Sequence, residues 1–348
     1  MSSSSSSLQN PLCGVMGLGG STTSAVVSSI MRDGAAIGLP KLIVSTMASG
    51  DVSGYVGDSD ITIMPSIVDI SGRLNDISER MLRNAAAAMA GMAHEYYSNL
   101  SATGSSEGKK ESKGKRIAIT MFGLTTPGVN AAMEKLATYK DANGDPMYNP
   151  VVFHATGAGG RSMERLIREG WFDGVLDLTT TELADNLAGG VLSAGPTRLT
   201  AASSVSIPQV ISLGALDMVN FGSPDSIPEQ YKNASPSRVF HEHNSSVTLM
   251  RTNVDECAKL GQELAEKLRA GGEAMSRKTA VVIPLGGWSG IDLPGEKFHD
   301  PEADARLVSQ LKEGLVGSDI QVEEVQGSIN DAATSEKAVQ LLHNLLSV

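Results

Sequence analysis

Short apolar runs alternate with helical segments along almost the whole chain, and this alternation constrains the fold most. A first series spans residues 12–100, where LCGVMGLGG, PKLIVSTMASG and DITIMPSIVDI predict buried strands separated or followed by helices. The pattern restarts at residue 116 with RIAITMFG and continues to the end of the chain. Strands that alternate with helices form parallel sheets covered on both faces. We therefore expect an α/β fold with two doubly wound domains and mainly parallel sheets.

A polar segment divides the two series. Residues 101–115 hold small, polar and charged side chains without one large apolar residue, a composition typical of a linker. Residues 1–11, which include six consecutive serines, predict a disordered tail. We expect a partial N-terminal domain over residues 12–100, because it is short of strands, and a complete C-terminal domain over residues 116–348.

Composition excludes several classes of function. A net charge of −11 and an aromatic content of 4% disfavour binding to nucleic acid or to anionic lipid. The chain has no apolar run of the roughly 18 residues that a membrane span needs, and its start lacks the features of a secretory signal. Cys13 and Cys257 do not have the spacing of a metal site or a disulfide framework. We expect a cytoplasmic protein that binds neither membranes nor nucleic acid directly.

Three glycine-rich turns follow apolar strands, at residues 17–22, 157–162 and 286–290. Glycines at the carboxyl end of a parallel strand bring backbone N–H groups close to an anion, and a following helix N-terminus adds partial positive charge. The turns therefore predict a phosphate site, although each one alone is also compatible with a tight strand-to-helix turn. The missing GxxxxGK[ST] motif disfavours P-loop chemistry, and an incomplete GxGxxG pattern disfavours a nicotinamide dehydrogenase. The candidate residues are Gly19, Gly20, Ser21, Thr22, Gly157, Gly159, Gly160, Arg161 and Gly287.

A polar loop follows the second predicted strand of the first series. Ser49, Gly50 and Asp51 open a run in which hydroxyls and carboxylates alternate with glycines. Such loops bind ribose hydroxyls or a phosphate-bound magnesium ion, and they also form simple Asx turns. We predict that Ser49 and Asp51 contact a ligand.

Further polar residues follow strands of the second series. Thr125 and Thr126 come after RIAITMFG, and Thr180 and Glu182 come after GVLDL. These side chains either contact a ligand at the sheet edge or cap the helices that follow. Arg251, at the end of SVTLMRT, is a candidate phosphate clamp, with a surface ion pair as the alternative.

Candidate acid–base groups are His241, His243, Asp292 and His299. The two histidines of HEHN alternate along a predicted strand, but the spacing is not HExxH and no third metal ligand is identifiable. We therefore predict no metal site, and an ordinary surface histidine remains an alternative at both positions. Asp300 suits the N-cap of the helix that follows it.

Several long segments carry a family resemblance. CGVMGLGGSTTSA, FHATGAGGRSMERLI, HEHNSSVTLMRT and PLGGWSGIDLPGEKFHDPEAD resemble successive signature segments of the Tm-one-like ATP-binding family, an uncharacterised protein family. The resemblance covers nearly the whole chain outside the tail and linker. It implies two Rossmann-like domains, nucleotide binding by the polar loops and a tendency to form homodimers, but no settled reaction.

Two departures from the family pattern stand out. Family members usually begin with a further strand-helix portion, so the resemblance implies a truncated first domain. Ser328, in the segment Ser328-Ile329-Asn330-Asp331, stands where a histidine is common in the family. A truncated parallel sheet would expose strand edges, so we expect a first domain of low stability or a dimer that buries it.

Together these observations predict a protein that binds ATP, with or without magnesium, in a cleft between the two domains. An alternative is a hydrolase or lyase that acts on a small phosphorylated or carboxylated metabolite, with His241 or His243 and Asp292 or His299 as acid and base. A second alternative is a non-catalytic protein-interaction module. The expected partners are a small phosphorylated ligand and a second copy of the chain.

Overall fold

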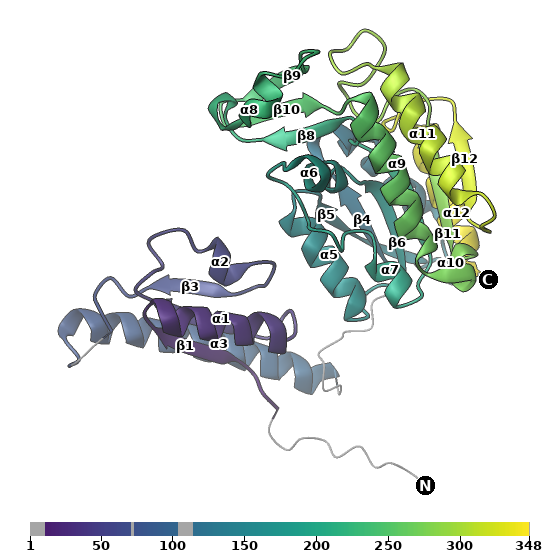
Figure 1. Ribbon diagram of the computed structural model, residues 1–348. Coiled ribbons are helices and arrows are strands. Elements are labelled where there is room, and N and C mark those ends of the chain that lie inside the picture. Colours follow the sequence, from purple (N-terminus) through teal and green to yellow (C-terminus); the bar gives the residue numbers. More distant parts are fainter. Residues whose placement is uncertain (1–10, 71–72, 104–113, 348) are drawn as a thin grey trace. The chain divides into compact units, whose positions relative to one another are not determined.

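A computed structural model describes residues 11–70, 73–103 and 114–347. The chain divides into two compact units, Met1–Glu111 and Ser112–Val348, called here the N-terminal unit and the C-terminal unit (Figure 1). Both units are α/β and contain parallel sheets, as the alternation of apolar runs and helices predicts.

The N-terminal unit contains a parallel sheet of three described strands in the order β1-β2-β3. The central strand is buried along its whole length, because alternate side chains face helices on opposite sides. Ile43 packs with Met31 of α1 on one face, and Leu42 packs with Ala85 of α3 on the other. The elements are β1 (Val15–Gly19), α1 (Ser21–Gly34), β2 (Lys41–Ser45), α2 (Ser53–Val56), β3 (Thr62–Pro65) and α3 (Asp76–Thr103).

Helix α3 is longer than the sequence pattern predicts. Asn75 caps it, since its Oδ1 accepts hydrogen bonds from the backbone N–H groups of Ile77 and Ser78, both at 3.0 Å. The helix continues three residues into the expected linker, and residues 104–113 of that linker lie outside the described ranges.

The C-terminal unit is built on a six-stranded parallel sheet in the order β12-β11-β7-β6-β4-β5. Helices α4 and α12 pack on one face through Val129, Leu136 and Leu342. Helices α6, α9 and α11 pack on the other face, where Leu260 and Leu307 are buried. The sheet strands are β4 (Lys115–Met121), β5 (Tyr148–His154), β6 (Gly174–Thr179), β7 (Gln209–Gly214), β11 (Thr279–Pro284) and β12 (Gln321–Val325). The helices are α4 (Thr126–Thr138), α5 (Ala158–Arg168), α6 (Glu182–Ala188), α7 (Ala201–Ser204), α8 (Glu229–Lys232), α9 (Val254–Arg269), α10 (Gly272–Ser276), α11 (Pro301–Leu315) and α12 (Ala332–Ser347), with 3-10 turns at Gly123–Thr125 and Pro224–Ser226.

The chain leaves the α/β pattern between β7 and α9. The run PQVISLGALDMV, expected to continue the alternation, is broken at Ala215, whose backbone φ of 56° turns the chain. The strands that follow form a separate antiparallel sheet in the order β8-β10-β9. They are β8 (Met218–Phe221), β9 (Phe240–Asn244) and β10 (Val247–Arg251).

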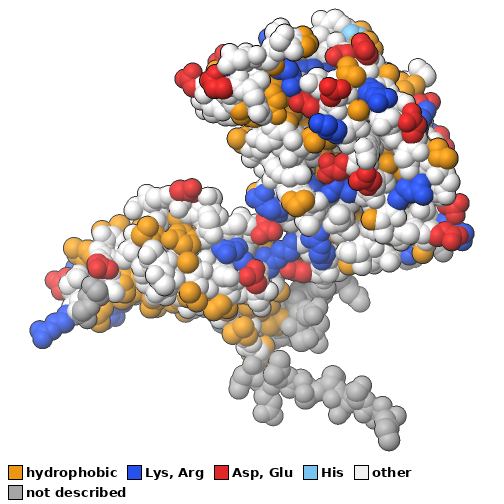
Figure 2. All heavy atoms as spheres, viewed as in Figure 1, with side chains coloured by type: hydrophobic (Ala, Val, Ile, Leu, Met, Phe, Trp, Pro, Cys, Tyr) orange, Lys and Arg blue, Asp and Glu red, His pale blue; other side chains and the backbone are white. Residues whose placement is uncertain are grey.

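Helix composition and surface charge bear on binding to membranes and polyanions. No helix in the described ranges is long and apolar enough to cross a bilayer. On the face of the C-terminal unit drawn in Figure 2, acidic and basic side chains are interspersed. This distribution provides no concentrated positive field for a polyanion on that face.

Candidate functional site

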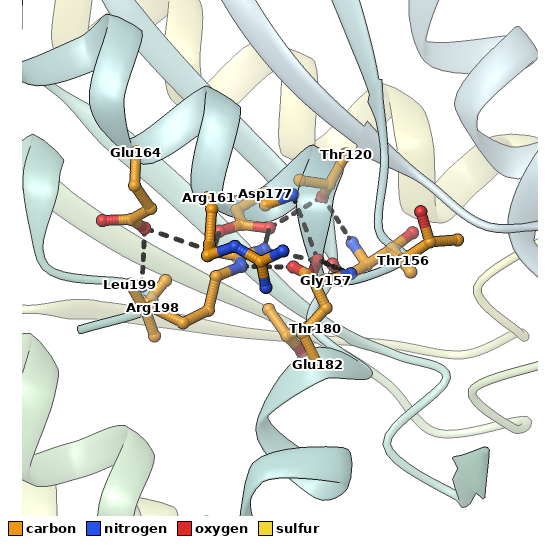
Figure 3. A network of polar contacts seen from close by, with 12 residues as sticks. Thr120, Thr156, Gly157, Arg161, Glu164, Asp177, Thr180, Glu182, Arg198 and Leu199 are labelled. Atoms are coloured by element: carbon orange, nitrogen blue, oxygen red, sulfur yellow. Dashed lines mark hydrogen bonds and ion pairs between the residues drawn. The ribbon is translucent and has the colours of Figure 1, made fainter. Parts of the chain in front are cut away.

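The crevice expected at the edge of the large sheet is filled by the protein's own side chains. The chain passes from β4 to β5 on one side and then returns to β6 on the other, so the carboxyl ends of β4 and β6 form a topological switch point. Arg198 lies fully buried there (Figure 3). Its guanidinium binds both carboxylate oxygens of Asp177 and, through Nε at 2.6 Å, Glu182. Buried side chains therefore occupy the place where a ligand is expected in this fold.

The glycine turn after β5 already holds an anion, which is the carboxylate of Glu182. Oε1 of Glu182 accepts hydrogen bonds from the backbone N–H of Gly157 at 2.6 Å and of Gly160 at 3.1 Å. Burial raises the pKa of Glu182, while Arg198 and the Gly157 amide act against this rise. A Cβ at Gly160 would lie 2.1 Å from Oε2 of Glu182, and one at Gly159 would lie 1.8 Å from the carbonyl oxygen of His154. Internal packing thus accounts for these glycines.

The neighbouring polar candidates also have internal partners. Arg161 donates to the carbonyl of Ser193 at 2.9 Å, and Thr180 donates to the carbonyl of Ser212 at 3.0 Å. Thr125 is buried and shares a hydrogen bond of 2.8 Å with Thr179. Thr126 donates to the carbonyl of Phe122 at 3.0 Å, at the start of α4. Thr125 is the N-cap residue of α4 but makes no side-chain cap hydrogen bond, so neither threonine caps the helix through its hydroxyl.

The glycine turn after β1 differs because no side chain of the unit binds its amides in the described structure. Gly20 is the N-cap of α1, without a side-chain cap, and the first turn of this 14-residue helix contains no acidic residue. Ser21 and Thr22 are exposed at the helix start, and the carbonyl of Gly19 accepts a hydrogen bond from Thr46 N at 3.2 Å. The partial positive charge of the helix terminus is thus uncompensated by an acidic side chain of α1.

A cavity of about 480 Å³ lies at the carboxyl ends of β2 and β3, beside this turn. Ser45, in its wall, shares a 2.7 Å hydrogen bond with Ser24 of α1. Thr46 Oγ1 lies 3.5 Å from the position that a Cβ would take on Gly20. The helix start and the cavity wall are therefore in contact. The lining residues are Ser45, Thr46, Ser49, Pro65, Ser66, Ile67, Val68 and Asp69.

Most of the cavity's polar residues are absent from the sequence prediction. The sequence predicts a ligand contact for Ser49, but it predicts a strand that includes Ser66 and Asp69, whereas β3 ends at Pro65. Ile67 has a backbone φ of 64° and is 72% exposed. A β-branched residue in the left-handed region is strained, and such strain is concentrated at functional sites. The signal that could have found these residues is their position directly after an apolar strand.

Two residues of the polar loop lie outside the cavity lining. Asp51 Oδ1 accepts a hydrogen bond from Ser53 N at 2.9 Å, and this backbone bond lowers the pKa of Asp51. Gly50 donates to the carbonyl of Met47 at 3.2 Å within a turn. Asp51 thus takes the position of an Asx turn ahead of α2 in this structure.

The guanidinium of Arg251 forms hydrogen bonds with groups of its own chain. Its Nε donates to the carbonyl of Phe298 at 2.7 Å, its Nη1 to Thr252 Oγ1 at 2.8 Å, and its Nη2 to the carboxylate of Asp304. Its guanidinium is buried. These internal bonds leave Arg251 neither on the surface, as its ion-pair alternative requires, nor free of partners, as a phosphate clamp requires.

The four acid–base candidates have different surroundings, and the rings of two of them, His241 and His243, lie 6.4 Å apart. His243 is exposed on β9, and the ring of His241 lies 6.3 Å from that of Phe298. Asp292 is fully buried and accepts a hydrogen bond from Trp288 N at 2.9 Å. Burial raises the pKa of Asp292 to about 8, and Asp217 adds to the rise.

His299 and Gly287 line a second cavity beside α11. A Cβ at Gly287 would lie 2.2 Å from the carbonyl oxygen of Asp292, so the close approach of the backbone requires glycine here. Asp300 caps α11 as predicted, since its Oδ1 accepts a hydrogen bond from Ala303 N at 3.0 Å. Within the described ranges, no group of three histidine, cysteine or acidic side chains is arranged to hold a metal ion.

The fold and these sites define an α/β protein with two parallel-sheet units. Two family models match it, described as the N-terminal and C-terminal domains of Uncharacterised protein family (UPF0261), over residues 2–98 and 114–346. The chain belongs to this family, which confirms the uncharacterised protein family expected from the sequence, whereas ATP binding stays a prediction.

Named relatives extend this match. A UPF0261 protein of Clostridium tetani is 45% identical over 345 residues, which cover 98% of this chain and 77% of that protein. The ToMV resistance protein Tm-1(GCR237) of Solanum lycopersicum is 44% identical over 326 residues, which cover 92% of this chain and 40% of the tomato protein. UPF0261 protein RA0729 of Rhizobium meliloti is 41% identical over 332 residues, 95% of this chain and 76% of that protein.

Proposed function

We propose that the chain binds a phosphorylated ligand, ATP or a related nucleotide, at the start of α1 in the N-terminal unit. The observation that carries this proposal is the uncapped helix terminus at Gly20, next to a cavity lined by hydroxyls. Backbone N–H groups at such a terminus bind phosphate oxygens, and the hydroxyls of Thr46 and Ser49 would bind other oxygens of the ligand.

The open space around Gly20 also supports a phosphate site at the start of α1. A Cβ there would meet only Thr46 Oγ1, at an ordinary contact distance of 3.5 Å, and the backbone φ of −86° suits any residue. Internal packing therefore does not require glycine at this position. A ligand that must approach the backbone closely would require it.

Magnesium would accompany the phosphates through Asp69. This carboxylate lines the cavity, and carboxylate oxygens are the protein ligands that magnesium prefers. Asp51, the acid predicted from the sequence, does not belong to the described lining of this cavity. Asp69 is therefore the acid that we assign to the metal-bound phosphate.

Ser21→Asp tests the site because stability and binding should change in opposite directions. A carboxylate in the first turn stabilises the helix by about 0.3–1 kcal/mol but repels a phosphate. Isothermal titration of the full chain with ATP and magnesium should show at least about a tenfold loss of affinity, while the N-terminal unit unfolds at a slightly higher temperature in calorimetry.

Ala36→Asp is the matched control, since it adds the same charge at an exposed position beyond the other end of α1. It should leave nucleotide affinity within about twofold. Equal losses in both variants would mean that net charge alone governs binding, and unchanged affinity in Ser21→Asp would refute the site at α1.

A further inference from the structure

The second cavity, beside α11 in the C-terminal unit, has the size and lining of a small-molecule site. Its volume is about 430 Å³, within the range of ligand pockets. Leu285 and Val308 contribute apolar surface, and Leu285 is 45% exposed there. The Lys312 and Glu324 side chains at its margin pair with each other. Asp304 is the remaining carboxylate of the wall.

Behind this wall lies a buried group of carboxylates around Arg251. Arg251 Nη2 donates to Asp304 and lies 3.6 Å from Asp292 Oδ1. Within the described part of the chain, neither Asp292 Oδ1 nor Asp217 Oδ1 accepts a hydrogen bond. Both side chains are fully buried, and the other oxygen of Asp217 accepts a 2.7 Å hydrogen bond from Ser289. A buried acceptor without a donor is rare in folded proteins and needs a physical reason.

The sign of the charge decides which ligand suits the cavity. One guanidinium, Arg251, faces three carboxylates, those of Asp217, Asp292 and Asp304, so the group has an excess of negative charge when all are ionised. Burial raises the pKa of Asp292 to about 8 and that of Asp217 to about 6, against the opposing effect of Arg251. Because Nε, Nη1 and Nη2 of Arg251 already donate hydrogen bonds to its own chain, few N–H groups are left to bind an incoming anion. A cation would relieve the excess charge.

We propose that this cavity binds an organic cation, a primary amine carried on an apolar body of about the size of an aromatic ring. The ammonium group would lie against Asp304, within the field of the buried carboxylates behind it. The apolar body would cover Leu285, Val308 and Pro294, which all line the cavity. This site is separate from the proposed phosphate site and does not depend on it.

The first test compares two probes of similar shape and opposite charge on the full chain. In an NMR titration, 2-phenylethylamine should bind at least about tenfold more tightly than 3-phenylpropionate. Binding of the amine should release protons and become tighter between about pH 6 and 8, because a nearby cation favours the ionised forms of Asp217 and Asp292. Equal or tighter binding of the carboxylate would overturn the proposal. The groups that act on these two acids or on Asp304 are Arg251, Ser289, His299 and Asp300, with Cys257 next to Arg251.

Two variants locate the site. Asp304→Asn removes the wall carboxylate and should weaken amine binding at least about tenfold. Ala305→Phe fills the cavity from an exposed position of α11 without a change of charge, and should also weaken binding. Arg306→Phe, at the next exposed position outside the lining, should bind at least as tightly as the original chain. If Asp304→Asn fails to fold, Ala305→Phe still decides, and unchanged amine affinity in Ala305→Phe would refute this location.

Discussion

Two of the three glycine-rich turns, one in each unit, have similar local sequences and different surroundings. Residues 17–22 (GLGGST) and 157–162 (GAGGRS) both link a parallel strand to a helix. In the C-terminal unit the turn encloses the buried carboxylate of Glu182. In the N-terminal unit the helix begins without a cap, beside a cavity lined by hydroxyls. The comparison teaches that the same local sequence can enclose a carboxylate of the chain or leave a helix start uncapped, so a glycine turn alone does not identify a ligand site.

Removal of Glu182 should have the largest effect on this comparison. Glu182→Ala leaves Arg198 and the amides of Gly157 and Gly160 without their carboxylate, so the free energy of unfolding of the C-terminal unit should fall by about 3–5 kcal/mol. Urea unfolding followed by tryptophan fluorescence measures this unit alone, because both tryptophans, Trp171 and Trp288, lie in it.

The same variant can show that the turn is an anion site. Sodium formate should restore part of the stability of Glu182→Ala, since a small carboxylate fits the vacated position, and should leave the original chain unchanged. Glu169→Ala is the control, because its ion pair with Arg165 is partly exposed and should contribute at most about 1 kcal/mol. A loss below about 1 kcal/mol in Glu182→Ala would contradict the internal-anion interpretation.

Asp185 in the C-terminal unit and Asp60 in the N-terminal unit have pKa values that shift in opposite directions. Burial raises the pKa of Asp185, on α6 of the C-terminal unit, to about 7, although Asn220 donates hydrogen bonds to its carboxylate. The folded state therefore binds this proton more tightly than the unfolded state, and stability falls as pH rises from about 4 to about 7. At Asp60, in the N-terminal unit, burial opposes ionisation, but hydrogen bonds from Lys41 and Gly38 prevail and lower the pKa. The stability that ionised Asp60 contributes to the folded N-terminal unit is lost as pH falls below about 4.

Asp185→Asn should therefore flatten the pH dependence of the C-terminal unit. The loss of stability between pH 4 and 7 should shrink by about 2–4 kcal/mol, since one pKa unit corresponds to about 1.4 kcal/mol. Urea unfolding detected by tryptophan fluorescence at several pH values measures this free energy of unfolding. Asp225→Asn, at an exposed position, should keep the original slope. An unchanged slope in Asp185→Asn would mean that Asp185 is ionised across this range.

Local sequence patterns predict the positions of the turns better than the partners that the turns bind. Gly19 and Gly157 end or follow strands as expected, because apolar runs and glycines are local signals. The partner of Gly157 lies 25 residues further along the chain, in Glu182. Both residues are candidates predicted from the sequence, but local patterns do not pair them, since their contact depends on the packing of α5 and α6 around Arg198.

The dependence on long-range contacts also explains two wrong predictions about the strands. The segment DITIMPSIVDI reads as one strand, but Pro65 ends it and leaves Ser66 and Asp69 in the cavity wall. Strands β8 and β10 are apolar and buried like the parallel strands, yet they pair antiparallel. Strand direction follows from the turn at Ala215 and from long-range pairing, which periodicity does not encode.

The smallest effects should come from the glycines themselves, and they compare the two turns most directly. Gly160→Ala places a Cβ 2.1 Å from Glu182 Oε2 and should destabilise the C-terminal unit by about 1–3 kcal/mol. Gly20→Ala meets only Thr46 Oγ1 at 3.5 Å, so it should destabilise the N-terminal unit by less than about 1 kcal/mol, the difference between glycine and alanine at an N-cap.

Ligand binding then separates the two glycines. The added methyl group at Gly20 lies where a phosphate would approach, so Gly20→Ala should lose most of the thermal stabilisation that the proposed site predicts for the N-terminal unit with ATP and magnesium in calorimetry. Gly160→Ala should keep that stabilisation, because the phosphate site is proposed for the other unit. If Gly20→Ala keeps the full shift while Gly160→Ala loses it, the nucleotide binds at the turn of the C-terminal unit, and Glu182 must leave that turn when the ligand enters.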